Sequence, residues 1–579
     1  MMKCKPLDEI LASVNVERIL GDIAAISNTI PSRLTGTEAG ERMAQYSRDR
    51  LLEIGLQADI AEYETELSLP RPTWIELGDL RTRIDAHTFG HSGTTPAEGL
   101  SGTLVDLGGA SEQEIAAIAR CSPKAIGLCD LAKGPPRQEK QRLARKFGLR
   151  ALVMYAPGGD DGDYLPYGSV KSLWGRPGEC GEVEACIPCI GISRRDGLRL
   201  RQGITGCDMR VVVHTDPGKI WGRVPVTLGA VQAESHDFIL VGGHQDSWYG
   251  PATTDNASGS AMMFELARVL MPYRQDFARG LRFGFWSGHE TGTMAGSSSW
   301  LDDNWELIRD HLATYVEIDQ PGLRGATVWG ITATDEIVDF ALSAHASAAT
   351  LDHCSVDRAY RIGDSSFFGA GIPTINACHK FHTAAMARCP GTPLGWWHHT
   401  IHNTTDRIDP VNLEKFARIT LITLFGLLHQ KVLPFRYSKA ASIIESAGNS
   451  FASQCGLPVP RAVSRLVPLA ASTDGLVDCL RTRGVFDEST VRLNQGMRRL
   501  NQFFVPLRYA FSPPWEQDSY GLSELDEPVP MLARRMQLEP KSARERSYWE
   551  AGCKRALNRF QTQVDAAVRE MEGLCRDLS

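Results

Sequence analysis

The sequence predicts an α/β fold in which helices cover both faces of a largely parallel mixed sheet, with a β-rich domain inserted and a helical domain at the end. Between residues 216 and 439, apolar runs suited to buried strands alternate with helical runs, beginning with FILVGG and SGSAMMFELARVL. Alternation of this kind is typical of a sheet sandwiched by helices. Residues 69–215 instead contain short β-rich runs with many Gly and Pro, and residues 440–579 have a helical pattern. We therefore expect the α/β domain to comprise residues 1–68 and 216–439.

The N-terminal part is expected to be helical from about residue 17 to 57 and to pack on the sheet that follows later in the chain. Thr37 has the side chain of a helix N-cap, and Gly55 suits the left-handed residue that ends a helix. These two signals predict a helix over RMAQYSRDRLLEI.

The inserted segment contains extended runs, SGTLVDLGG and KAIGLCDL, then a helical run near GPPRQEKQRLARKFG and a strand at ALVMYAP. Cys186 and Cys189 have CxxC spacing, but a zinc knuckle needs a second pair and none follows at suitable spacing. A buried strand over ACIPCIGI is the simpler interpretation. Fourteen cysteines are ordinary usage in 579 residues, and we expect them to be reduced thiols.

The C-terminal segment carries an apolar stripe at helical spacings of three and four residues. Its members are Leu557, Phe560, Val564, Ala567, Met571, Leu574 and Leu578. Such a stripe is most often a core face within the chain, and pairing with a second subunit is the alternative.

Composition excludes several classes of protein. A hydrophobic content of 42% and a charged content of 23% are those of a soluble globular protein. The net charge of −7 offers no basic surface for nucleic acid. Charged residues interrupt the start of the chain before a signal-peptide apolar block forms, and no run approaches the roughly 18–20 apolar residues of a membrane helix. We expect a cytoplasmic protein that binds neither nucleic acid nor membrane.

Four polar clusters follow predicted strands of the α/β region: GGHQDSWYGPATTDNASG, SGHETGTMAGS, VEIDQPG and WHHTIHNTTDRIDP. Open α/β sheets bind ligands at the carboxyl ends of their strands, so these clusters are expected to meet. They supply His, Asp and Glu, donors suited to zinc, manganese or cobalt, without the cysteines of a closed structural site. The pattern favours a catalytic metal centre.

Single members of these clusters have simpler interpretations. A lone His or Asp near a strand end is usually a cap or a satisfied polar group. Asp255 begins a helical run, where its carboxylate would cap the helix, although capping and metal bridging are compatible. Asp246, two residues after His244, is placed to orient that imidazole. The combination of four clusters, and not any one residue, favours the metal interpretation.

The motifs GGHQDSW, TTDNASGSA, FGFWSGHETGTMAGSSSWLDDN and HTIHNTTDRIDP closely resemble the family of zinc aminopeptidases, glutamate carboxypeptidases and transferrin receptors. The resemblance covers nearly the whole chain. It implies a zinc-exopeptidase-like fold, a protease-associated-like insertion at 69–215 and a dimerisation-like helical domain at 440–579. A homodimer through that helical domain is the expected assembly.

Carried over by residue, the resemblance makes His244 and Asp319 ligands of one metal ion, Glu290 and His399 ligands of another, and Asp255 the bridge. It implies two divalent ions, expected to be zinc with manganese or cobalt as alternatives, that activate water to hydrolyse an amide. His399 is chosen because HTIHNTTDRIDP matches the family's His-Thr-x-x-Asp-Thr pattern only with this residue first. His402 is the alternative ligand.

Two positions depart from the family pattern. His289 occupies the place of the glutamate that takes the proton from the metal-bound water. Imidazole, with a reference pKa of ~6.5 against ~4.3 for glutamate, remains able to act as a base, but nearby dications disfavour its protonated form. We therefore expect an unusual amide, ureido or lactam substrate. Asn403 stands where the family has an acid, which weakens the expected support behind His399.

The run RIGDSSFFGAGIP resembles the family's substrate-side loop. Arg361 is a candidate to hold a substrate carboxylate and Asp364 a candidate to hold an amine, with a structural salt bridge as the alternative for both. Trp248 and Tyr249 are candidates for the pocket wall, with plain packing as the alternative.

The leading hypothesis is a dinuclear metallohydrolase that cleaves a C–N bond in a peptide or small molecule, with His289 as the proton shuttle and Asp246 beside it in the catalytic set. One alternative is a lyase or cyclase that uses the same metals. Another is a binding protein of the receptor type that has lost catalysis. Retention of all five ligands argues against the receptor type.

Overall fold

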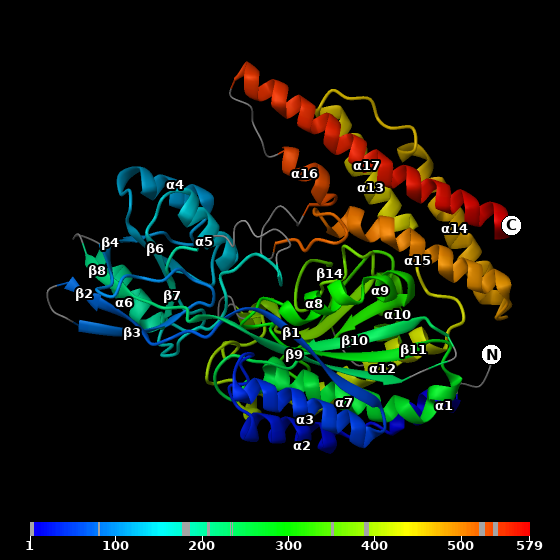
Figure 1. Cartoon of the computed structure of the whole chain (residues 1–579), viewed down its shortest axis with the longest axis horizontal. Helices are drawn as coiled ribbons and strands as arrows, with labels where there is room; N and C mark the ends of the chain where they lie inside the picture. Colours follow the sequence, from blue (N-terminus) through cyan, green and yellow to red (C-terminus); the bar gives the residue numbers. More distant parts are fainter. Residues whose placement is uncertain are drawn as a thin grey trace.

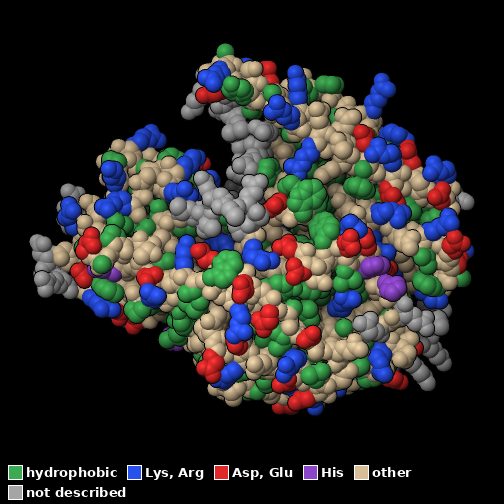
Figure 2. Space-filling model, in the orientation of Figure 1, with side chains coloured by type: hydrophobic (Ala, Val, Ile, Leu, Met, Phe, Trp, Pro, Cys, Tyr) green, Lys and Arg blue, Asp and Glu red, His purple; other side chains and the backbone are tan. Residues whose placement is uncertain are grey.

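The computed structural model describes residues 5–78, 82–176, 186–204, 209–231, 233, 235–348, 353–386, 393–519, 527–536 and 542–578. Its eight-stranded sheet lies at the centre of the molecule, with a closed barrel on one side and long C-terminal helices on the other (Figure 1). Lys and Arg are interspersed with Asp and Glu over the face shown in Figure 2, so this face has no patch of a single charge.

The central sheet is mixed. In spatial order its strands are β1 (Gln57–Ser68), β9 (Lys219–Val231), β11 (Gly280–Trp286), β10 (Phe238–His244), β12 (Leu312–Glu317), β15 (Thr374–Lys380), β13 (Val328–Ala333) and β14 (His353–Arg358). The inner strands β11, β10, β12 and β15 run parallel to one another, whereas β1 with β9, β9 with β11, and β15 with β13 are antiparallel. Strands β10 and β12 are buried along their whole length, as strands covered on both faces must be.

Helices cover both faces of this sheet, as the alternating pattern predicts. One layer contains α2 (Val16–Thr29), α3 (Glu38–Ile54), α7 (Ser258–Leu270), α10 (Val338–Ala348) and α12 (Pro410–His429), with α1 (Lys5–Ala12) against α12. The opposite face is covered by α8 (Ala295–Asp303) and α9 (Trp305–His311). The expected ends of α3 are confirmed, because the Thr37 side chain accepts from the Gly40 amide and Gly55 has a φ of 97°.

The inserted segment forms a closed seven-stranded barrel, called the barrel below. Its strands in order are β2 (Thr73–Leu77), β3 (Thr82–Thr88), β7 (Cys189–Ile192), β6 (Ala151–Tyr155), β5 (Ile126–Asp130), β4 (Leu100–Asp106) and β8 (Arg210–His214). Helices α4 (Glu112–Cys121), α5 (Arg137–Lys146) and α6 (Arg194–Ile204) accompany it. Cys189 is fully buried in β7, in agreement with the strand interpretation of ACIPCIGI.

The remaining chain is helical. It comprises α13 (Ser438–Gln454), α14 (Val463–Arg483), α15 (Glu488–Tyr509), α16 (Pro530–Met536) and α17 (Ala543–Leu578), and a short α11 (Thr383–Met386) precedes the segment that carries His399. The apolar stripe of α17 is buried against α14 and α15 within the chain, except that Leu578 is half-exposed. The stripe is therefore a core face, and the homodimer stays a prediction. Within the described ranges, no helix combines the length and apolarity that crossing a membrane requires.

Candidate metal centre

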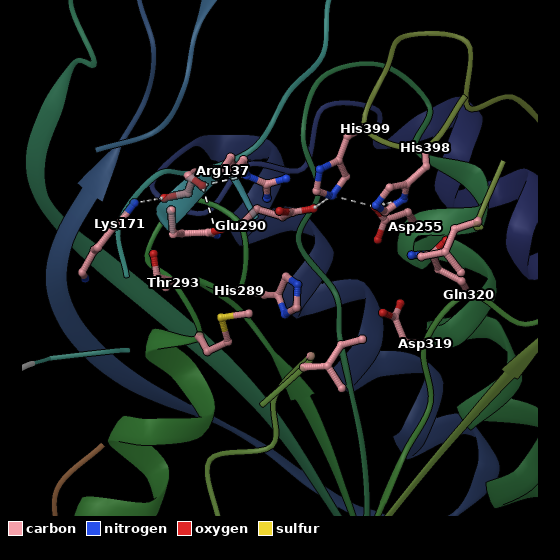
Figure 3. A pocket seen from close by; sticks show the side chains of 16 residues that line it. Arg137, Lys171, Asp255, His289, Glu290, Thr293, Asp319, Gln320, His398 and His399 are labelled. Carbon is pink, nitrogen blue, oxygen red and sulfur yellow. Dashed lines mark hydrogen bonds and ion pairs between the residues drawn. The ribbon is translucent and has the colours of Figure 1, made fainter. Parts of the chain in front are cut away.

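The five predicted ligands lie at one edge of the sheet. His244 is the last residue of β10, and Asp319 follows β12 by two residues. Glu290 lies in the loop after β11, and Asp255 lies in the turn Thr253–Ala257 before α7. His399 comes from the segment before α12. Figure 3 shows Asp255, Glu290, Asp319 and His399 around one cavity, so side chains from four separate loops converge there.

Asp255 lies between two pairs of donors. One of its oxygens is 3.0 Å from Nε2 of His244, and the other is 3.1 Å from Nε2 of His399. Nε2 of His244 is also 3.6 Å from Oδ1 of Asp319, and Nε2 of His399 is also 3.1 Å from Oε1 of Glu290. This is the division of donors that the family resemblance implies, with Asp255 between the two groups.

The donor atoms fit divalent cations. His244 Nε2, Glu290 Oε1 and Asp319 Oδ1 are buried, and their close polar neighbours are other members of the same cluster. Buried polar atoms are costly unless they are paired or coordinate a metal, and nitrogen and carboxylate oxygen donors suit zinc, manganese and cobalt. The site therefore has the composition and the donor spacing of a metal centre.

The charges of the donors depend on one another. Burial lowers the pKa of His399, but Glu290 and Asp255 outweigh it and raise this pKa to about 9. Burial raises the pKa of Glu290, but His399 outweighs it and holds this pKa at about 2. Both groups are thus charged at neutral pH, and binding of a cation would release protons from the imidazoles.

Asp246 connects two of the loops that carry donors. Nδ1 of His244 is 3.1 Å from the backbone oxygen of Asp246 and 3.5 Å from its Oδ1. The other carboxylate oxygen accepts hydrogen bonds from Thr35 Oγ1 at 2.9 Å and from the amides of Gly288 at 3.1 Å and Glu290 at 3.3 Å. Asp246 therefore fixes the His244 ring and the position of the Glu290 backbone together.

The start of α7 is organised by Asn256, and the capping interpretation of Asp255 is wrong. Asn256 Oδ1 accepts from the amides of Gly259 at 3.0 Å and Gln320 at 3.1 Å, and its Nδ2 donates to the backbone oxygens of His244 at 3.2 Å and Ile318 at 3.0 Å. The helix has no other side-chain cap. Because Asn256 takes this structural role, both oxygens of Asp255 face the histidines.

His289 lies against the donors. Its ring stacks on that of His244 with centroids 3.9 Å apart, and its Nδ1 is 2.9 Å from Oδ2 of Asp364. Asp364 is fully buried, and its other oxygen accepts from Ser297 Oγ at 2.7 Å. Burial and His244 lower the pKa of His289, but Asp364 and Glu290 outweigh them and raise it to about 9. Asp364 thus contacts the imidazole and not the cavity.

Arg361 does not line the cavity that holds the donors. Its Nη1 donates to Gln517 Oε1 at 2.6 Å, and its guanidinium lies 5.2 Å from the Trp174 ring. The structure therefore favours the structural alternative for both Arg361 and Asp364 over direct contact with substrate.

Trp248 and Tyr249 are not among the residues that line the cavity. They pack with Leu34 and Tyr167, and the Tyr249 hydroxyl donates to the Pro70 oxygen at 3.2 Å. Plain packing is the interpretation that agrees with these contacts.

The neighbours of His399 have other roles. The ring of His402 lies beside that of Trp396, with centroids 5.6 Å apart, and His402 is not among the residues that line the cavity. Asn403 Oδ1 accepts from the amide of Thr254 at 2.8 Å, so this residue holds the turn that carries Asp255.

Sequence reasoning missed His398, whose Nδ1 is 3.2 Å from Asp255 Oδ2 and whose ring stacks on His399 at 4.0 Å. The signal was the pair of adjacent histidines, of which the motif match used only one. It also missed Arg137, Gln138 and Lys171 of the barrel segment, which line the same cavity of about 140 Å³. No motif marks these residues.

The fold and the donors define a chain similar to the metal-dependent peptidases. Residues 226–424 match the model of Peptidase family M28, and this span contains all five predicted ligands. The resemblance inferred from the sequence is thus confirmed. Solved structures with a similar fold include a zinc aminopeptidase from Bacillus subtilis, with a TM-score of 0.56 and 19% identity over 72% of this chain and 96% of that one. An aminopeptidase from Aneurinibacillus sp. strain AM-1 has a TM-score of 0.54 and 20% identity, over 73% of this chain and 96% of that one.

Two curated relatives share about a quarter of their residues with the chain. Aminopeptidase Y of Saccharomyces cerevisiae is 24% identical over 276 residues, which are 46% of this chain and 49% of the relative. A probable glutamate carboxypeptidase, VP8 of Zea mays, is 24% identical over 363 residues, which are 52% of this chain and 50% of the relative. The chain therefore spans about half the length of the curated relatives it matches.

Proposed function

We propose that this protein is a metal-dependent hydrolase that cleaves an amide-type C–N bond in a peptide or a small peptide-like molecule. The observation that carries the proposal is the convergence of two histidine–carboxylate pairs on the two oxygens of Asp255, beside a cavity that Asp255, Glu290, Asp319 and His399 line. Donor atoms of His244, Asp255 and Asp319 lie within 4.8 Å of one another, and so do those of Asp255, His398 and His399, which is spacing that could hold a metal ion.

The donors divide between two ions. His244 and Asp319 would hold one ion, Glu290 and His399 would hold the other, and Asp255 would contribute to both. His398 is a further nitrogen donor, because it faces the same Asp255 oxygen as His399. Zinc is the expected ion, with manganese or cobalt as alternatives. Bound divalent ions supply Lewis acidity, which polarises the substrate carbonyl and lowers the pKa of water.

His289 is placed to move the proton. Because Asp364 engages Nδ1, the ring is held in one orientation and Nε2 is the nitrogen left for the cavity, which His289 lines. Asp364 fixes the tautomer and stabilises the protonated ring, as a carboxylate behind a catalytic histidine does in other hydrolases. With divalent ions nearby to disfavour the protonated ring and bring its pKa below the value of about 9, His289 would accept a proton at Nε2 and return it to the departing nitrogen.

The test starts from the purified full chain stripped of metal with a chelator. Zinc, manganese or cobalt is then added, bound metal is counted by elemental analysis, and hydrolysis of a panel of dipeptides, N-acyl amino acids and ureido compounds is measured. We expect about two ions per chain and turnover only in the metal-loaded protein. A chain that binds no divalent ion would overturn the proposal.

The reaction class is tested separately in oxygen-18 water. Hydrolysis places one solvent oxygen in the acyl product, whereas a lyase or cyclase step does not. Label in the product supports the proposal, and an unlabelled product shifts it to the non-hydrolytic alternative. A fully metal-loaded chain that turns over no compound of the panel would favour a binding role of the receptor type.

A further inference from the structure

A second cavity lies where α8 covers strands β1, β9 and β11 of the central sheet. It has a volume of about 380 Å³, against about 140 Å³ for the cavity beside the donors, and the two share none of their described lining residues. In β10, Leu240 lines the second cavity, whereas His244, four residues later, belongs to the donors. A strand rises about 3.3 Å per residue, so the two positions are roughly 13 Å apart along β10. The second cavity is therefore a separate place on the same domain.

The floor of the second cavity is a row of side chains from four neighbouring strands. Ala230 of β9 pairs with Gln57 of β1 on one side and with Arg282 of β11 on the other. Arg282 pairs in turn with Leu240 of β10. Residues directly opposite each other in neighbouring strands point to the same face of a sheet. The methyl group of Ala230 fills little of this row, so the cavity opens beside the longer side chain of Arg282.

Arg282 carries a partly buried positive charge. Its guanidinium lies 4.2 Å from the centroid of the Phe238 ring, which is a favourable cation–π contact. Among the described residues, no group accepts a hydrogen bond from this guanidinium and no carboxylate forms an ion pair with it. Burial lowers the pKa of Arg282, and no carboxylate opposes this shift. A bound anion would supply the missing counter-charge, because the N–H donors of a guanidinium match the oxygens of a carboxylate or a phosphate.

The rest of the lining is largely apolar. Leu228, Leu240 and the buried Trp300 contribute hydrophobic surface. Among the described lining residues, the one carboxylate is that of Asp59, which is exposed and whose Oδ1 accepts from the Ile60 amide at 2.8 Å. Ligand cavities in proteins are typically about 300 Å³ or larger, so the volume is sufficient. A guanidinium among apolar walls fits a small molecule that carries an anionic group on an apolar body.

We propose that the second cavity is a binding site for a small amphipathic anion, in which Arg282 holds a carboxylate or phosphate group and the apolar residues hold the rest of the molecule. The site is separate from the proposed metal centre, and its occupation does not depend on a bound ion. Strand β11 ends just before the loop that carries His289 and Glu290, and α8 begins just after it. The ligand therefore contacts both segments that hold this loop.

The experiment measures binding of 4-phenylbutyrate, phenyl phosphate and the uncharged 4-phenylbutanol to the full chain by isothermal titration calorimetry. Wild type and Arg282→Gln are compared with the control Arg223→Gln, because Arg223 lies exposed on β9 and pairs with Glu41 at 2.7 Å. We expect wild type and the control to bind at least one of the anions at least about tenfold more tightly than the alcohol, as one hydrogen bond between charged groups allows. Arg282→Gln should lose this advantage. The anion that binds more tightly identifies carboxylate or phosphate as the group recognised.

Two further measurements separate this site from the metal centre and from misfolding. Each titration is run on the zinc-loaded and on the chelator-stripped chain, and the binding that depends on Arg282 should be equal in both. Ala230→Leu narrows the floor and keeps Arg282, so it should weaken binding of the anion and the alcohol alike, by about tenfold. Thermal unfolding checks that each variant folds. Failure of wild type to bind either anion, equal affinity of Arg282→Gln and Arg223→Gln for both anions, or binding only in the zinc-loaded chain would overturn the inference and leave the proposed hydrolase unaffected.

Discussion

Two partly buried histidines, His87 in the barrel and His399 in the candidate metal centre, have pKa values shifted in opposite directions from that of free histidine. The pKa of His87 is lowered to about 3, because burial disfavours the charged ring and its neighbours are the aromatic rings of Tyr167 and Tyr249. Burial acts in the same direction on His399, but Glu290 and Asp255 outweigh it and raise its pKa to about 9. The fold therefore creates a charged histidine only where it also buries carboxylates, so these carboxylates, and not burial, distinguish the site from the core.

The largest test of this comparison removes the shared carboxylate. Asp255→Asn keeps the shape of the residue and removes the charge that faces both His244 and His399. We expect zinc affinity to fall by on the order of 4 kcal/mol, about a thousandfold, with loss of activity. Equilibrium dialysis with elemental analysis measures the affinity. Unchanged zinc binding would remove Asp255 from the donors.

A smaller loss of activity is expected from replacing His289, which is not a predicted metal ligand. His289→Ala should lower turnover by at least about a hundredfold, because it removes the proton carrier, while bound metal stays at the wild-type level. His402→Ala is the control, since His402 packs on Trp396 and does not line the cavity. Loss of metal in His289→Ala would show that His289 is a metal ligand. Loss of metal in His402→Ala would favour His402 over His399 as the ligand.

The barrel histidine gives a stability effect with a known sign. Because the folded pKa of His87 is about 3 and the unfolded value is ~6.5, the unfolded chain takes up a proton as the pH falls below about 6.5 and the folded chain does not. Stability is therefore lost as the pH falls from 7 to 5, by about 2 kcal/mol from this residue. In denaturant unfolding, the free energy of unfolding of His87→Phe should fall between pH 7 and 5 by about 2 kcal/mol less than that of wild type. The control His353→Phe, at an exposed histidine, should show the same pH dependence as wild type. A slope that His87→Phe leaves unaltered would show that this imidazole is charged in the folded chain.

The smallest effect concerns the residue behind His289. Asp364→Asn should lower turnover about tenfold, as loss of an orienting carboxylate does, with metal content unchanged. Its effect should vanish in the His289→Ala background, because Asp364 acts through that ring. Additive losses in the double variant would show that Asp364 has a separate role.

The sequence predicted the α/β sheet, and the convergence of the candidate ligands at its edge, for a physical reason. Strands buried on both faces are continuous apolar runs, and His244 and Asp319 stand at or just after the ends of two of them. The carboxyl ends of neighbouring parallel strands meet, so the convergence of these residues follows from the pattern. The other three predicted ligands were placed by their motifs.

Other features were beyond sequence reasoning. Asp364 was a candidate to hold a substrate amine, with a structural salt bridge as the alternative. It lies against His289, 75 residues away in the chain, and the packing of Ser297 and Glu317 around it determines this. Arg137 reaches the cavity because of how the barrel sits against the sheet, and nothing local in the sequence encodes that orientation. The role of Asn256 at the start of α7 was hidden by the stronger signal of its neighbour Asp255.

The hydrogen bonds between the barrel and the loops of the sheet have a further consequence. Tyr167 bonds to the backbone of His399, and His91 Nε2 donates to the backbone oxygen of Thr291, the residue after Glu290. Separating the barrel from the sheet must therefore disturb two of the donor loops. By thermodynamic reciprocity, an ion that steadies those loops also strengthens the attachment of the barrel. Binding of such an ion and attachment of the barrel would therefore be thermodynamically coupled.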